Sequence, residues 1–392
     1  MLVQFTIENH RSIKNSSVVS FAASKDKSLE GCLLPMDSKK SLLPAIAVYG
    51  ANAAGKSNVL HAMMTMREMV VGEAARISKG QKLPWEPFGG TKEPTAFESV
   101  FLYQGIRYAY GFSFDARKIY AEYLYHWPNG REALIFSREN GDYEFRENVN
   151  EQMTLSNRTP ENKLYLVSSN DWNLPQTENA YKWFLEKLTF LMDEEPADSE
   201  TVAQILEGDD RKARILKELL LADLGISDVI IKNLTDKTLL ISTTHRIIHE
   251  DGSTEYFQLL MDQESAGTQR FFSRIGGWLQ ALENGALLVV DEIEDSLHPL
   301  LTKRLIEMVQ DRKINTNGAQ ILFTTHDCLL LDLKFFRRDQ IWFAEKDDKT
   351  CATEVYSLAS FSPRKGENVR KGYLQGRFGA IPFVGGDSLW QS

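Results

Sequence analysis

The chain has 392 residues, 43% of them hydrophobic, and a formal net charge of −9. This length favours two or three domains, or one domain with an insertion. The negative balance argues against a protein that coats nucleic acid over its whole surface. Cys32, Cys328 and Cys351 lack paired spacing, so neither a disulfide framework nor a zinc site is indicated. No apolar run reaches the length of a membrane span and the N-terminus does not resemble a signal peptide, so we expect a cytoplasmic protein without membrane contact.

In chain order, residues 1–23 alternate apolar and polar side chains, which predicts two short strands. Residues 50–57 then read GANAAGKS and match the phosphate-binding loop G-x-x-x-x-G-K-[ST]. An apolar run precedes the motif and a helix-forming segment follows it, so backbone N–H groups and a helix N-terminus would surround a phosphate. The motif therefore predicts a nucleoside triphosphate as ligand, contacted by Gly50, Asn52, Ala53, Ala54, Gly55, Lys56, Ser57 and Asn58.

Two side chains of this loop have separate expected roles. Lys56 would reach the β- and γ-phosphates, and Ser57 would hold Mg²⁺ through its hydroxyl group. Nothing read from the residues distinguishes ATP from GTP.

The middle of the chain predicts strands and then helices. Residues 76–95 are rich in proline and glycine and read as loop, whereas residues 96–147 are rich in β-forming aromatic residues. Those aromatic side chains could stack on bases, but burial on strand faces is the favoured interpretation. Apolar residues recur at helical spacing over residues 178–224, and strands return after about residue 228. No heptad pattern is long enough for an extended coiled coil.

Farther along, residues 286–290 form an apolar run that ends in Asp291 and Glu292. A buried parallel strand delivers such acids to its C-terminal edge, where open α/β sheets bind ligands. Asp291 would order the shell of Mg²⁺, and Glu292 would orient or deprotonate the attacking water.

Two more segments point to the same site. Residues 320–325 form another apolar strand, followed by His326, which could contact the γ-phosphate or be structural. Ser265 is a plausible N-cap before a helix, and Gly267 would permit close approach to a phosphate, although this segment alone is an ordinary helix start.

The order of these motifs resembles the ABC-type ATPase heads of SMC and RecF-like proteins. Residues 291–299, DEIEDSLHP, are similar to the D-E-x-E-x-x-L-H-P run of RecF-like and overcoming-lysogenization-defect (OLD) ATPases, and residues 9–12, NHRS, are similar to their N-F-R-S turn. The compact RloA- and AbiL-type ATPases look closest, because of a serine-x-glycine-threonine signature at residues 265–268 and a tail like residues 373–382. The resemblance covers roughly residues 1–70 and 255–385.

The resemblance implies ATP and Mg²⁺ as cofactors and ATP hydrolysis as the reaction, in a homodimer or higher homo-oligomer. Each nucleotide would lie between two copies, with Ser265, Gly267 and Thr268 acting in trans and His298 at the dimer seam. Arg11 would lie near a phosphate or the base. This chain departs from the usual signature, because Ala266 replaces a glycine and Thr268 follows Gly267. The glutamine that senses Mg²⁺ could be Gln81, Gln104 or Gln152.

RloA- and AbiL-type proteins are typically ATPase components of bacterial anti-phage systems, which implies a separate effector nuclease as partner. Two alternatives stay open: a RecF-like repair ATPase that binds DNA directly, and an ATP-bound scaffold with little turnover. Basic residues of the tail, interleaved with Tyr373 and Phe378, could contact nucleic acid or an acidic partner; they are Arg364, Lys365, Arg370, Lys371 and Arg377. The other interpretation is an ordered tail that packs these two aromatic residues on the core.

We therefore expect an α/β fold of the ABC-type ATPase head, with a mixed and parallel sheet and flanking helices. Residues 1–75 would form the N-terminal part of the core, and residues 76–150 a β-rich region attached to it. Residues 151–235 would be a helical insertion. Residues 236–392 would complete the core with the signature, the Asp-Glu strand, the His strand and the tail.

Overall fold

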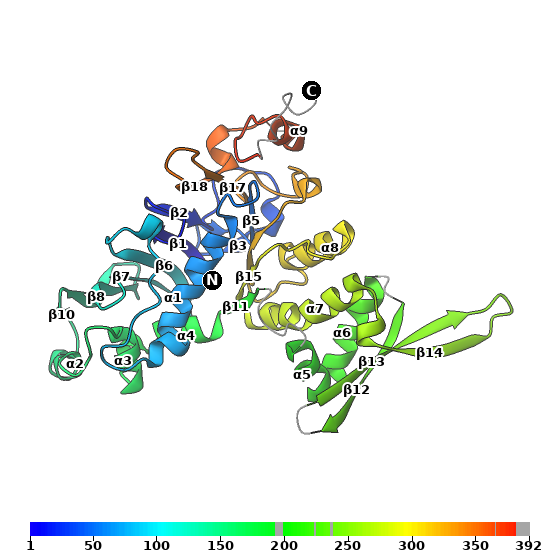
Figure 1. Cartoon of the computed structure of the whole chain (residues 1–392), viewed down its shortest axis with the longest axis horizontal. Coiled ribbons are helices and arrows are strands. Elements are labelled where there is room, and N and C mark those ends of the chain that lie inside the picture. Colours follow the sequence, from blue (N-terminus) through cyan, green and yellow to red (C-terminus); the bar gives the residue numbers. More distant parts are fainter. Residues whose placement is uncertain (193–198, 223–224, 236–237, 365, 382–392) are drawn as a thin grey trace, which may run out of the picture.

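A computed structural model describes residues 1–192, 199–222, 225–235, 238–364 and 366–381 (Figure 1). Its centre is a six-stranded sheet in which five neighbouring strands run parallel and the edge strand β18 is antiparallel. The strands lie in the order β11 (Leu188–Leu191), β15 (Leu287–Val290), β16 (Gln320–Thr324), β5 (Ala45–Tyr49), β17 (Ile341–Lys346) and β18 (Thr353–Ser357). The chain thus has the expected mixed α/β fold.

The three central strands are apolar because both faces of the sheet are covered. Every residue of β5, β15 and β16 is buried. Along β5, Ile46 and Val48 pack in one core with helix α1 (Lys56–Val71), whereas Ala45 and Ala47 pack in the other core with α7 (Ala266–Asn284). A strand that alternates its side chains between two covered faces has no polar face to present to water.

A second, antiparallel sheet packs on the α1 side. Its seven strands lie in the order β10 (Asp142–Phe145), β9 (Ala133–Glu139), β8 (Ile119–Trp127), β7 (Ile106–Phe114), β6 (Thr95–Tyr103), β1 (Leu2–Glu8) and β2 (Ser17–Ser20). The two N-terminal strands, which we expected with the ATPase core, thus belong to this sheet with the β-rich region. The burial of its aromatic residues is confirmed: Phe97, Phe101, Tyr103, Tyr108, Tyr110, Phe112 and Phe114 all lie in the core shared with α1.

Helices cover the remaining faces. The cluster formed by α2 (Val149–Ser156), α3 (Tyr165–Asp171) and α4 (Pro175–Glu186) lies beside the antiparallel sheet, and α7 with α8 (Pro299–Gln310) and α9 (Val369–Leu374) lies on the far side of the parallel sheet (Figure 1). The strand β11 falls inside the segment expected to be a helical insertion, yet it pairs with β15. Short elements complete the fold: β3 (Leu34–Pro35), β4 (Ser41–Leu42), and the 3-10 turns Glu30–Cys32, Glu73–Arg76, Phe88–Gly90, Met261–Gln263, Cys328–Leu330 and Leu358–Phe361.

A three-stranded sheet extends from the end of the molecule that carries α5 (Ser199–Glu207) and α6 (Asp209–Leu221) (Figure 1). Its strands are β12 (Ile226–Thr235), β13 (Thr238–Ile248) and β14 (Thr254–Leu260), joined in antiparallel register. The boundary that we placed at residue 235 therefore falls inside one sheet. Within the described residues, no helix is long and apolar enough to cross a membrane.

Candidate nucleotide site

The phosphate-loop motif lies between β5 and α1, which begins at Lys56. Two of its glycines are required by the backbone. A Cβ atom at Gly50 would collide with the carbonyl oxygen of Ala344, and Gly55 has a φ of +95° and would bring a Cβ against the hydroxyl of Thr353. Side chains rarely adopt that φ, so glycine is the residue that fits. The motif thus has the strand–turn–helix context that phosphate binding needs.

The Lys56 side chain folds back into this loop. Only 5% of the residue is exposed, and its Nζ donates hydrogen bonds to the carbonyl oxygens of Gly50 (3.2 Å) and Ala51 (3.0 Å). Burial lowers the pKa of Lys56, while the negative charges of Glu292 and Asp291 oppose that shift. A phosphate oxygen that entered the loop could replace the two carbonyl contacts of the ammonium group.

The Asp-Glu strand meets the phosphate loop at Asp291. The hydroxyl of Ser57 donates to Oδ1 of Asp291 at 3.0 Å, and the hydroxyl of Thr324 donates to the same oxygen. Ser57 lies in the first turn of α1, Asp291 follows β15 and Thr324 ends β16, so three elements converge on one carboxylate. The pairing of β15, β16 and β5 brings their C-terminal ends to one edge of the sheet.

Glu292 and His326 lie next to each other at this edge. Oε1 of Glu292 lies 3.9 Å from Nε2 of His326. Glu292 has a φ of +43°, a left-handed conformation that non-glycine residues seldom adopt and that often marks functional sites. Burial, and next the positive charge of Lys56, lower the pKa of His326, so its ring is neutral at pH 7.

Three residues to which the sequence analysis gave no role at the site join the loop from distant segments: Ser12, Thr353 and Lys346. Asn58 donates from its side chain to the hydroxyl of Ser12 at 2.6 Å. The hydroxyl of Thr353 lies 2.7 Å from that of Ser12 and 2.9 Å from the carbonyl oxygen of Ala54. Lys346, at the end of β17, faces the same space. Ser12 follows Arg11 in the N-terminal turn, but no local pattern marks Thr353 or Lys346.

These groups surround a cavity of about 410 Å³. It lies within the size range of small-molecule sites. Its lining comes from the phosphate loop, the start of α1, the residues that follow β15 and β16, the N-terminal turn and β17. The lining residues are Ser12, Asn52, Ala53, Gly55, Lys56, Ser57, Asn58, Glu292, His326 and Lys346. Segments expected to share a site thus share one cavity.

Some expected contacts lie elsewhere. Nε of Arg11 pairs with Glu86 at 2.6 Å, and the backbone N–H of Arg11 donates to the Glu86 carbonyl oxygen at 2.8 Å. Among the described residues, neither Arg11 nor any of the three candidate glutamines lines the cavity. Gln81 accepts from the backbone of Ser78, Gln104 lies in the β6–β7 turn, and Gln152 is buried in α2.

The signature residues lie outside this cavity. Ser265 caps α7, because its Oγ accepts from the backbone N–H of Thr268 at 3.1 Å. A Cβ atom at Gly267 would lie 3.1 Å from the carbonyl oxygen of Ser296, so this position favours glycine. His298 caps α8 by accepting from the N–H of Leu300 at 3.3 Å. In the described chain, Ser265, Gly267, Thr268 and His298 do not line the 410 Å³ cavity.

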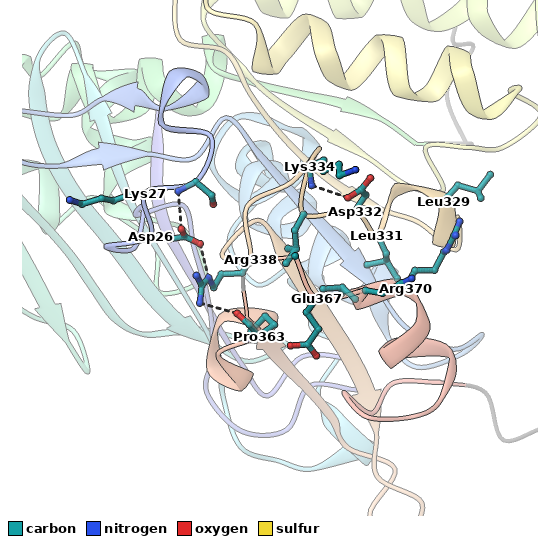
Figure 2. A pocket seen from close by; sticks show the side chains of 15 residues that line it. Asp26, Lys27, Leu329, Leu331, Asp332, Lys334, Arg338, Pro363, Glu367 and Arg370 are labelled. Carbon is teal, nitrogen blue, oxygen red and sulfur yellow. Dashed lines mark hydrogen bonds and ion pairs between the residues drawn. The ribbon is translucent and has the colours of Figure 1, made fainter.

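The basic tail borders another cavity, of about 610 Å³, between the loop after β16 and residues 26–28 (Figure 2). Arg338 spans it by pairing with Asp26 at 2.6 Å, and Arg370 lies at its rim. Arg377 pairs with Glu367. Arg364 and Lys371 are exposed, and Lys365 lies outside the described residues.

The aromatic residues of the tail are not available for stacking on bases. Tyr373 and Phe378 are buried, and both rings stack on Phe343 of β17. Of the two interpretations of the tail, the packing of its aromatic residues on the core is therefore confirmed, because both rings lie against Phe343 in the core.

A phosphate loop between β5 and α1, at the edge where a largely parallel sheet ends, defines an α/β phosphate-loop domain. Residues 45–332, more than half of the chain, match the family described as "AAA domain, putative AbiEii toxin, Type IV TA system". The chain belongs to this family and therefore carries an AAA-type ATPase domain. The match shows this family and not the RloA- and AbiL-type group that we expected from the sequence.

Other comparisons are distant. No curated protein sequence matches the chain. The crystal structure of the SmcHead bound to the C-winged helix domain of ScpA is similar with a TM-score of 0.39 and 13% identity, covering 92% of this chain and 99% of that chain. The fold assignment rests on the order of the strands and the position of the phosphate loop.

Proposed function

We propose that this chain binds and hydrolyses ATP in the 410 Å³ cavity. The observation that carries the proposal is the contact between Ser57 and Asp291, which joins the phosphate loop to an acid 234 residues farther along the chain. Phosphoryl transfer depends mainly on positioning and charge stabilisation, and this contact brings the two parts of such a site together.

The residues at this contact fit Mg²⁺. Magnesium prefers oxygen ligands and is usually held by one or two carboxylates together with substrate phosphates. The hydroxyl of Ser57 and the carboxylate of Asp291 lie at 3.0 Å from each other, and Thr324 holds the same carboxylate. When bound there, Mg²⁺ would neutralise charge on the phosphates.

The chain's own residues divide the remaining work. The ammonium group of Lys56 would hold the β- and γ-phosphates. Glu292 is half-exposed and lines the cavity, so its carboxylate would accept the proton of the attacking water. His326 is neutral at pH 7 and could donate one hydrogen bond to the γ-phosphate without adding a charge. Arg11 would contact the nucleotide only after its ion pair with Glu86 opens.

We further propose that ATP joins two copies of the chain. Ser265 and His298 are exposed and lie outside the cavity that the phosphate loop lines. A role for Ser265, Gly267, Thr268 and His298 on a nucleotide therefore requires the nucleotide of a second copy. ATP binding would favour the associated state, and hydrolysis would release it.

The biological role that we propose is the ATPase component of an anti-phage system that controls a separate effector nuclease. The family description, which reads "putative AbiEii toxin, Type IV TA system", supports an association with defence, and the resemblance to RloA- and AbiL-type proteins supports the separate effector. The alternative of direct DNA binding by a repair ATPase loses base stacking by the tail, because Tyr373 and Phe378 are buried, but the exposed Arg364, Arg370 and Lys371 could still contact phosphates.

Replacing Lys56 tests the nucleotide site. We expect Lys56→Ala to weaken ATP binding at least about 30-fold, since a charge-assisted contact of about 2 kcal/mol is lost. Fluorescent ATP binding and phosphate release would measure affinity and turnover. Lys349→Ala removes the same charge from an exposed turn outside the cavity and should bind ATP normally. Unchanged ATP affinity in Lys56→Ala would reject the site.

A further inference from the structure

The second glutamate of the acidic run, Glu294, contacts the backbone of His326, just after β16. Its Oε1 accepts a hydrogen bond from the backbone N–H of His326. Glu292, two residues earlier, lines the cavity, whereas Glu294 does not. The two glutamates therefore face different parts of the same edge, and His326 lies between them.

The backbone that carries Glu294 is held firmly. The N–H of Ile293 donates to the carbonyl oxygen of Thr324 at 3.1 Å, and the N–H of Glu292 donates to the Thr324 hydroxyl at 2.8 Å. From the other side, the buried Arg274 of α7 donates to the carbonyl oxygen of Ile293 at 2.6 Å. This turn is thus clamped between β16 and α7, so the position of the Glu294 carboxylate is set by the fold.

The surroundings of Glu294 are rich in buried acceptors. Its Oε2 and the Oδ2 of Asp327 are buried without a hydrogen-bond partner among the described residues. Tyr49, the last residue of β5, has a buried hydroxyl that likewise lacks a partner there. Burial raises the pKa of Tyr49 strongly, and the charges of Asp327 and Glu294 add to that shift, so the hydroxyl stays protonated and can act as a donor.

Such a cluster is costly to bury, and core packing alone does not require it. Each of its members ends or follows a strand of the six-stranded sheet: Tyr49 ends β5, Glu294 follows β15 and Asp327 follows β16. Asp327 also accepts from the N–H of Leu329 at 2.8 Å, which fixes the turn after His326. The contacts of Glu294 with the His326 N–H and of Asp327 with the Leu329 N–H hold the backbone on either side of the histidine.

We propose that Glu294 is a positioning residue that holds His326 in place for hydrolysis, with Asp327 fixing the turn that follows the histidine. The inference rests on the proposed ATPase activity. Glu294 touches no substrate in this arrangement. It acts through the backbone of His326, and therefore affects the turnover step more than the binding of ATP.

Two variants of Glu294 separate its possible roles. Glu294→Ala removes the acceptor for the His326 N–H, and we expect kcat to fall at least tenfold while the dissociation constant for ATP stays within threefold of the wild type. Glu294→Gln has the same shape and keeps an acceptor oxygen, so it should retain most of the turnover that Glu294→Ala loses. Glu367 offers a matched control, because it also accepts a backbone N–H, from Arg364 at 2.9 Å, but does not line the 410 Å³ cavity. Glu367→Ala should hydrolyse ATP normally.

A double-mutant cycle with His326→Ala then tests the link to the histidine. If Glu294 acts through His326, Glu294→Ala should cost no further turnover in the His326→Ala background. Full additivity of the two losses, or a Glu294→Ala variant with wild-type kcat, would overturn the inference while leaving the ATPase assignment intact. A wild-type protein without any turnover would overturn both.

Discussion

At the scale of single residues, His10 is the clearest buried group without a compensating contact. The residue is 0% exposed, neither ring nitrogen has a hydrogen-bond partner among the described residues, and its ring packs edge-on against Phe97 at 5.3 Å. Burial, followed by the charge of Arg11, lowers the pKa of His10 to about 4. The neutral imidazole is therefore the form that the fold accepts.

This shift predicts a pH dependence of stability. Between pH 6.5 and about 4, the unfolded chain binds a proton at His10 and the folded chain does not, so the free energy of unfolding falls as the pH falls. The loss over this window is about 3 kcal/mol for a shift of this size. Urea unfolding at pH 7 and pH 4.5 would measure it.

His10→Leu should remove this part of the pH dependence, because the packed ring is replaced by a group that does not titrate. His249→Leu changes an exposed histidine and should keep the dependence. An equal loss of stability in the wild type and His10→Leu would show that other groups cause it.

At the scale of elements, the contact between α5 and α7 depends on a glycine. The hydroxyl of Thr201 in α5 donates to the carbonyl oxygen of Phe272 at 2.7 Å and accepts from the N–H of Gly276 at 2.9 Å. A Cβ atom at Gly276 would collide with the backbone of Thr201. The two helices can approach this closely only because Gly276 has no side chain.

In Gly276→Ala the backbone of α5 must move away, which costs about 1–3 kcal/mol. The gain of about 1 kcal/mol that alanine brings to a helix offsets part of this cost, so we expect a net loss of stability of up to about 2 kcal/mol. Gly277→Ala is the matched control: it brings the same helical gain, and its nearest neighbour is the end of the Leu191 side chain, at 3.1 Å. Thermal unfolding of both variants should rank Gly276→Ala clearly lower; the reverse order would contradict the close contact.

At the scale of the whole molecule, the proposed nucleotide-driven association can be tested with two substitutions: one at Glu292, inside the 410 Å³ cavity, and one at Ser265, outside it. Glu292→Gln should keep ATP bound, slow hydrolysis at least about 100-fold, as expected when a catalytic base is lost, and accumulate a dimer in the presence of ATP and Mg²⁺. Sedimentation velocity with and without ATP would measure the associated fraction. Wild-type turnover in this variant would rule out Glu292 as the base.

Ser265→Arg, added to Glu292→Gln, should spare ATP binding and prevent association, because a bulky charge then occupies the exposed start of α7. Thr254→Arg places the same charge on the exposed strand β14 and should leave association intact. Normal dimerisation of the Ser265→Arg protein would mean that the signature does not act on a second copy.

The effector proposal calls for a pull-down of the Glu292→Gln protein from its native host with ATP and Mg²⁺. A stoichiometric protein partner encoded next to this chain would support a two-component defence system. Recovery of DNA alone, lost at moderate salt, would favour the repair ATPase instead.

The sequence by itself determined the local parts of the candidate site. The motif at residues 50–57 could be read directly, because a phosphate loop needs its glycines and lysine at consecutive positions of one turn. Asp291 and Glu292 could be read in the same way, since an apolar run that ends in acids identifies a buried strand and its carboxyl end. Helical and strand periodicity also predicted the strands within residues 1–23 and 96–147 and helices within residues 178–224.

Only the tertiary structure decided which distant segments meet. Thr353 and Lys346 reach the phosphate loop because β17 pairs with β5, and no local pattern encodes that neighbour. The placement of β1 with β6, and the burial of Tyr373 against Phe343, were likewise outside the reach of periodicity. Strand order and the packing of faces are set by the burial of the whole core, whereas a motif is set by the backbone geometry of a few adjacent residues.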